Sequence, residues 1–144
     1  MAKKKLVTAK GVLTDAEVAQ FDAEVKKWQT LLNLGDWRIE RSKKAARKMV
    51  MAEVVRRELA HRLASYRLNR DWSNEEHITG RLLEEIALHE VLHVFLHELL
   101  EHSGTPGTSE SDIEAAEHRV INTLTRLLVP DDAMRQLLTA LGVK

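Results

Sequence analysis

The segment His89-Glu90-Val91-Leu92-His93 lies in a stretch, residues 73–103, whose apolar residues recur every three or four positions. That spacing is typical of one face of a helix. The face contains Ile78, Leu82, Ile86, His89, His93, Leu96 and Leu100. Ser73 with Glu76 is typical of a capping box, and Ser103-Gly104 is typical of a helix end. The pattern therefore predicts one long helix from about residue 73 to residue 103.

The two histidines of this segment have the spacing that binds one metal ion. Residues four apart on a helix lie one above the other, so His89 and His93 can reach the same ion. The chain has no cysteine, so a transition-metal site must use His, Asp or Glu. A surface helix carrying these residues by chance is the alternative. Their place on an apolar face disfavours it, because buried imidazoles need partners. We therefore expect a Zn²⁺ site.

Glu90 follows the first of the two histidines directly. This offset can place its carboxylate beside the open position of the metal, where a water molecule is bound. Zinc lowers the pKa of that water, and the carboxylate takes its proton. The resulting hydroxide attacks a carbonyl that the same ion polarises. The pattern thus predicts Glu90 as the general base of a hydrolysis.

A third ligand is expected downstream of the two histidines. The metzincin pattern would need Gly at position 96 and His at position 99, and leucine at both positions excludes it. The candidates are Glu114, Glu117, His118, His102 and His97. Glu117 is preferred because it shares a predicted helix face with four apolar residues, where a carboxylate is costly to bury without a cation. Those residues are Ile113, Val120, Ile121 and Leu124.

The other candidates have competing interpretations. Glu114, one turn earlier, is the main competitor of Glu117. His97 continues the histidine stripe but would point past the ion, as a core residue or behind a ligand. His118 could orient a ligand or bind substrate. His102, near a helix end, is expected to be exposed.

Residues that follow Glu117 carry a family resemblance. Glu117 is followed by Asn122, Leu124 and Leu127-Leu128-Val129-Pro130. With the histidine segment, this resembles the gluzincin clan of metallopeptidases over about residues 37–130. It is most similar to the small intracellular branch, the ImmA/IrrE family and the short phage and prokaryotic minigluzincins. The resemblance implies a zincin-like fold and a zinc ion bound by His89, His93 and Glu117.

The remaining pattern predicts a single α+β domain over residues 1–144, of which residues 1–10 could be disordered. Thr14 with Glu17 indicates the start of a helix over 15–33. Strands are expected at 37–41, 49–58 and 62–69, forming a small mixed sheet of about three strands. Further helices are expected at about 111–128 and 131–141.

In zincins, the edge strand of this sheet forms the upper rim of the cleft, where a peptide can add as an extra strand. Residues 62–69 are the candidate edge. Tyr66 could then stabilise an oxyanion, although packing on the sheet is the more ordinary role of such an aromatic residue.

Charge is unevenly distributed although the formal net charge is zero. Residues 38–70 carry +8 and residues 71–144 carry −9. The basic segment could bind nucleic acid, but such charges also protect edge strands from aggregation. No apolar run is long enough for a membrane span, and no secretion signal is recognisable, so a cytoplasmic location without membrane contact is expected.

Three functions are compatible with these features. The leading expectation is a zinc metallopeptidase that hydrolyses a peptide or protein substrate. The second is a zinc-binding structural or regulatory module with little turnover, its cleft plugged by residues 130–144. The third is a nucleic-acid-associated protease similar to the SprT-like family. The oligomeric state is left open.

Overall fold

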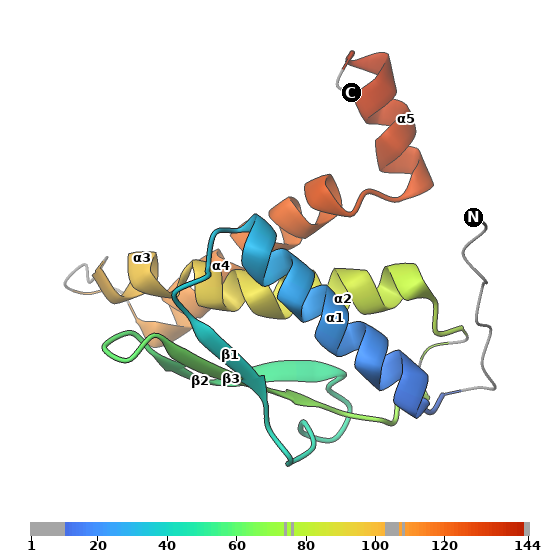
Figure 1. Cartoon of the computed structure of the whole chain (residues 1–144). Helices are drawn as coiled ribbons and strands as arrows, with labels where there is room; N and C mark the ends of the chain where they lie inside the picture. The colour runs from blue at the N-terminus through green and yellow to red at the C-terminus, as the bar shows by residue number, and fades with distance from the viewer. Residues whose placement is uncertain (1–10, 74, 76, 103–106, 108, 143–144) are drawn as a thin grey trace.

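The structure is a computed structural model that describes residues 11–73, 75, 77–102, 107 and 109–142. The expected disorder of residues 1–10 falls outside this part of the chain. The elements, in order, are α1 (Asp15–Leu31), β1 (Arg38–Arg41), β2 (Ala52–Glu58), β3 (Leu63–Leu68), α2 (Gly80–Phe95), α3 (His97–His102), α4 (Glu110–Leu128) and α5 (Asp132–Ala140). The predicted α+β class and small mixed sheet are confirmed (Figure 1).

The sheet has the strand order β1-β3-β2, with β3 parallel to β1 and antiparallel to β2. The prediction that residues 62–69 form the edge next to the cleft is therefore wrong. β3 lies in the centre, because the chain passes from one edge to the other before it returns between them. Its alternate residues Ala64, Tyr66 and Leu68 are buried. β2 is the edge strand that lies against α2.

An aromatic cluster joins α1 to the sheet. The Phe21 ring lies 5.8 Å from the Tyr66 ring and 6.4 Å from the Trp72 ring, measured between centroids. The Tyr66 hydroxyl donates a hydrogen bond to Asp22 Oδ1 at 2.7 Å. Tyr66 is thus a packing residue under α1, and the proposed oxyanion role has no support from its position.

α2 is buried on nearly all sides, with α1, β2 and α4 packed around it (Figure 1). Consecutive residues such as Glu90, Val91 and Leu92 are buried together, so most sides of this part of the helix are covered. The predicted stripe through His89 and His93 is only partly buried. The most deeply buried residues lie beside that stripe: Leu83, Ala87, Leu88 and Val91.

α2 begins later than the sequence predicts. Thr79 is its N-cap and accepts a hydrogen bond from the Leu82 N–H at 3.1 Å. The predicted cap at Ser73 is wrong, and its partner Glu76 lies outside the described residues. The segment before Ser73 is instead fixed by a contact with Gly11, because the Trp72 backbone N–H donates a hydrogen bond to the Gly11 carbonyl at 2.6 Å. A tertiary contact therefore delays the helix.

α2 also ends earlier than predicted. Leu96 is its C-cap, and the backbone N–H of Leu96 bonds to the carbonyls of Leu92 and Val94. α3 then starts at His97, where the sequence pattern predicted a continuous helix to residue 103. His97 therefore belongs to a different helix from His89 and His93.

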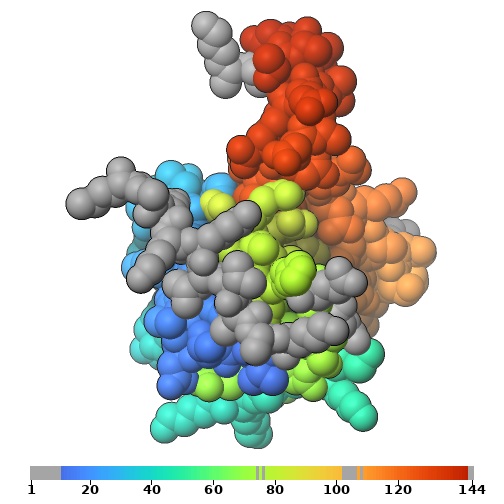
Figure 2. All heavy atoms as spheres, turned by 90° about the vertical axis from the view of Figure 1, so that its right-hand side faces the viewer, coloured from blue at the N-terminus to red at the C-terminus, as the bar shows by residue number. Residues whose placement is uncertain are grey.

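The last two helices follow the predicted boundaries closely. Ser109 and Asp112 form a capping box at the start of α4, and Asp131 caps α5. α5 stands away from the body of the molecule and buries none of its residues (Figures 1 and 2). The predicted plugging of the cleft by this segment is thus not seen in its described part. No described helix is long and apolar enough to cross a membrane.

The contrast between α2 and α5 gives a stability prediction. Leu88 is fully buried in α2, whereas Leu137 in α5 is 51% exposed. We expect Leu88→Ala to lower the free energy of unfolding by about 2–5 kcal/mol, because it leaves a cavity in the core. Leu137→Ala should change it by less than about 0.5 kcal/mol. Urea denaturation monitored by circular dichroism measures both, and equal effects would contradict this packing.

Candidate metal centre

A cavity of about 580 Å³ opens between the edge strand and three helices. β2 and the loop before it form one wall, and α2, α3 and α4 form the others. The residues that bear on its chemistry are Glu53, Val54, Arg57, His89, Glu90, His93, His97, Glu114, Glu117 and His118. Two of the residues predicted at the site, Tyr66 and His102, are not among its described lining residues, and the side chain of His102 lies outside the described part.

Three imidazoles meet at the floor of this cavity. Each of His89, His93 and His118 has a ring nitrogen within 4.8 Å of the others. Their ring centroids are 5.0 Å apart for His89 and His93, and 4.8 Å apart for His93 and His118. α2 supplies two of the rings through its four-residue spacing, and α4 brings the third. Among the described residues, this is the group with the donor atoms to hold a metal ion.

Glu117 is brought to the same place but is engaged differently. Its Oε1 atom lies 3.1 Å from His93 Nδ1 and accepts a hydrogen bond from Arg57 Nη1 at 2.9 Å. The side chain is only 5% exposed. The sequence predicted that a carboxylate buried at this position needs a cation nearby, and Arg57 is a cation that pairs with it.

Sequence reasoning missed Arg57, and a β-bulge explains why. Residues opposite each other in an antiparallel pair share one face of the sheet. Val54 lies opposite Tyr66, and Arg57 lies opposite Ala64, because the register shifts between Val54 and Arg56. Strict alternation from Val54 would instead have turned Arg56 toward the helices. Only the extra residue of the bulge turns Arg57 toward α2, where it also donates to the His93 carbonyl at 3.2 Å.

His89 and His93 are held in their neutral form near neutral pH. Burial, together with the neighbouring rings of His93 and His118, lowers the pKa of His89 to about 4 against the opposing effect of Glu117. Burial also lowers the pKa of His93, against the opposing effect of Glu117. Near neutral pH both rings therefore keep a free electron pair. A neutral imidazole with a free electron pair is the form that binds metal ions.

Glu90 has the environment of a proton acceptor. It is 5% exposed, and one of its oxygens, Oε2, has no hydrogen-bond partner. Burial raises the pKa of Glu90 to about 7, while the backbone N–H of Val54 and the charge of Arg57 oppose that rise. An unpartnered carboxylate oxygen in a polar cavity is costly unless a ligand or water satisfies it.

These observations test whether the residues fit the metal that the resemblance implies. The donor set consists of imidazole nitrogens and carboxylate oxygens, which suits zinc and related divalent ions. Burial favours the neutral form of His89 and His93, and Glu90, which lines the same cavity, has a buried oxygen without a hydrogen-bond partner. The residues present therefore fit a divalent metal ion.

The remaining candidates lie at the margin of the site. Glu114 is exposed, and its backbone carbonyl is 3.0 Å from His118 Nδ1. His97 is buried against Trp37, with 6.2 Å between ring centroids, and its Nε2 atom is 3.8 Å from Glu101 Oε1. Neither belongs to the group of three imidazoles. His97 is thus a wall residue of the cavity, as its place on α3 requires.

Comparison with family models, with curated proteins and with solved structures finds no significant match. The assignment of a function therefore depends on the chemistry of this cavity.

The raised pKa of Glu90 gives a pH-dependent prediction for the metal-free protein. The folded state binds a proton at Glu90 more tightly than the unfolded state, so this group costs stability as pH rises from about 4.5 to about 7. Glu90→Gln removes that cost. We expect the variant to gain about 2–3 kcal/mol over wild type between pH 4.5 and pH 8.

Unfolding by urea in the presence of a chelator, repeated across this pH range, measures the gain. Other titrating groups contribute equally to both proteins and cancel. Glu40→Gln on β1 is the control, because the Glu40 side chain is 57% exposed and does not line the cavity. A difference between Glu90→Gln and wild type that stays constant across this pH range would contradict the burial argument.

Proposed function

We propose that this protein is a metal-dependent peptide hydrolase of the zincin type, and that its metal is zinc. The observation that carries the proposal is one cavity lined both by the buried Glu90, whose Oε2 atom has no hydrogen-bond partner, and by His89, His93 and His118, whose ring nitrogens lie within 4.8 Å of one another. The resemblance to the gluzincin clan supports it independently. So does the order of elements, in which a small sheet precedes the histidine helix and a second helix follows it.

The chain's own residues divide the work as follows. His89 and His93, from successive turns of α2, bind the ion, and α4 completes the site with one of two adjacent residues, Glu117 or His118. Bound there, a divalent ion supplies a Lewis acid that lowers the pKa of a water molecule and polarises a carbonyl group.

Glu90 moves the proton. Its Oε2 atom accepts a proton from the attacking water, whose oxygen forms a bond to the carbonyl carbon. Glu90 then gives this proton to the nitrogen of the departing amine as the carbon–nitrogen bond breaks. A carboxyl group with a pKa near 7 is well suited to both steps, because its two protonation states are close in free energy near neutral pH.

The edge strand favours a peptide as substrate. β2 pairs with β3 on one side, and no other described strand pairs with it. Its residues Glu53, Val54 and Arg57 line the cavity. An extended peptide can hydrogen-bond to such an edge and thereby bring a carbonyl group over the imidazoles.

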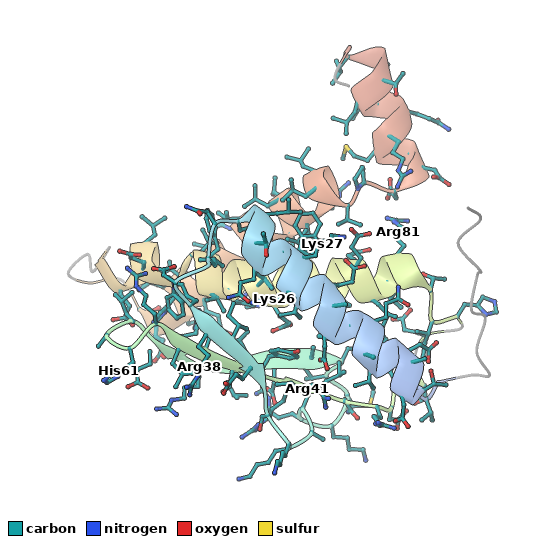
Figure 3. The ribbon with its side chains drawn as sticks, viewed as in Figure 1. Lys26, Lys27, Arg38, Arg41, His61 and Arg81 are labelled. Carbon is teal, nitrogen blue, oxygen red and sulfur yellow. The ribbon has the colours of Figure 1, made fainter. Side chains whose placement is uncertain are left out.

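The basic segment does not favour the nucleic-acid-associated alternative. Most arginines of residues 38–70 form ion pairs: Arg38–Glu40, Arg41–Asp22, Arg47–Glu53, Arg56–Glu58, Arg57–Glu117, Arg62–Glu98 and Arg70–Asp15. Of the side chains labelled in Figure 3, Arg38 and Arg41 come from β1 and His61 comes from the β2–β3 turn. Paired and scattered cations attract phosphates weakly.

The role of Glu90 is tested by Glu90→Gln. We expect peptide hydrolysis to fall by at least about 100-fold, because glutamine cannot take the proton, while one equivalent of metal stays bound. Hydrolysis of a peptide library and elemental analysis of the same samples measure the two effects. Glu40→Gln is the matched control and should keep full activity. Full activity in Glu90→Gln would refute this mechanism, and a wild-type protein that binds metal but cleaves no peptide would favour a binding module.

Metal binding itself is tested by His93→Ala. Wild type should bind one equivalent of zinc, and zinc at 100 times its Kd should stabilise it by about 2.7 kcal/mol. His93→Ala should lose both effects, because one ligand is removed. His61→Ala, in the β2–β3 turn, is the control and should behave as wild type. Thermal unfolding with and without zinc measures the stabilisation, and an equal gain in His93→Ala would exclude this site.

A further inference from the structure

We propose that His118, and not Glu117, is the third metal ligand, and that Glu117 and Arg57 together orient His93. This inference rests on the proposed function, which leaves the third ligand open between two adjacent residues of α4. It differs from the gluzincin arrangement, in which a glutamate binds the ion directly. The argument uses the hydrogen bonds of the two rings and the partners of the carboxylate.

The Nδ1 atom of each ring is already engaged, which leaves the other nitrogen for the metal. His118 Nδ1 is 3.0 Å from the carbonyl oxygen of Glu114. A carbonyl oxygen only accepts, so His118 Nδ1 carries the hydrogen, and in the neutral ring Nε2 carries the free electron pair. The same reasoning applies to His93, whose Nδ1 lies 3.1 Å from Glu117 Oε1. Both rings therefore have Nε2 available as a ligand atom.

The distances suit a shared ion. The ligand nitrogens of His89, His93 and His118 lie within 4.8 Å of one another. Nitrogens around a tetrahedral zinc ion are separated by about 3.4 Å, since each bond measures about 2.1 Å. Side-chain rotations that bring the nitrogens up to about 1.4 Å closer would thus complete the site. Glu117 is not a member of this group.

Glu117 is committed to other partners. Its Oε1 atom accepts from Arg57 Nη1 at 2.9 Å and from His93 Nδ1. A guanidinium at this distance competes with a metal ion for the electrons of the carboxylate. Arg57 also donates to the His93 carbonyl at 3.2 Å, so it joins β2 to both α2 and α4. The arginine thereby holds the carboxylate beside His93 Nδ1.

This arrangement has a chemical consequence for His93. A carboxylate that accepts the Nδ1 hydrogen of an imidazole fixes the ring orientation and makes the metal-binding nitrogen more basic. Glu117 is therefore a positioning residue for His93, and Arg57 acts through Glu117. β2, the edge strand to which a peptide substrate is expected to add, thus also influences the orientation of the metal ligand His93.

The experiment counts imidazole ligands. Zinc-loaded full-length protein is studied by X-ray absorption at the zinc edge, which distinguishes two from three bound imidazoles. We expect three in wild type, three in Glu117→Gln and two in His118→Ala. Zinc affinity, measured by competition with a chelator, should fall by more than about 100-fold in His118→Ala and by about 10- to 100-fold in Glu117→Gln. Arg126→Gln, at an exposed position of the same helix that does not line the cavity, is the matched control and should keep wild-type affinity.

A double variant tests the role of Arg57. Arg57→Gln alone should weaken zinc binding, but it should cause no further loss in a Glu117→Gln background, because Arg57 acts through that carboxylate. A purely structural role of Arg57 would give additive losses and would overturn this part of the proposal.

Other outcomes separate this inference from the proposed function. Two imidazoles in wild type, unchanged by His118→Ala, would make Glu117 the ligand and overturn the inference, while the hydrolase proposal stands. A wild-type protein that binds no zinc would overturn both. The count in wild type needs no variant, so a misfolded variant does not remove the test.

Discussion

The burial of polar side chains on α2 is the constraint on which the rest of this structure depends. α2 runs through the middle of the molecule, and Glu90 is almost fully enclosed. Ionised or hydrogen-bonding groups in such a place need partners or they cost stability. The backbone N–H of Val54 provides a hydrogen bond to the Glu90 carboxylate, whereas the Oε2 atom is buried without a partner. The same burial that raises the pKa of Glu90 therefore also lowers the stability of the folded protein.

A second consequence follows from the same enclosure. Burial lowers the pKa of His89 and His93, and the neighbouring imidazoles lower it too, because a positive charge on one ring would raise the cost of a charge on the next. Glu117 would be equally costly to bury alone, and Arg57 offsets its charge across the gap between sheet and helix. The polar groups of β2, α2 and α4 thus form one connected network, in which a change in one group alters the electrostatics of the others.

The remainder of the molecule serves mainly to hold these elements in place. α1 covers the sheet through Phe21 and Tyr66, and the segment around Gly11 fixes the chain ahead of α2. Gly11 has φ of +91°, and a Cβ there would lie 2.8 Å from the Ser73 backbone, so only glycine permits this approach. α5, which stands clear of the body, takes no part in this support.

The amino-acid sequence by itself determined the local features: the capping box at Thr14, the approximate bounds of the strands, the helix stop at Pro130 and the two histidines on one helix face. These depend on residues that are neighbours along the chain. Tertiary structure alone decided that β3 is central, that α2 starts at Gly80, and that Arg57 reaches Glu117. Strand order, the contact of Trp72 with Gly11 and the β2 bulge join residues far apart or shift a register by one residue. The periodicity of apolar residues along the chain predicts neither such long-range contacts nor such register shifts.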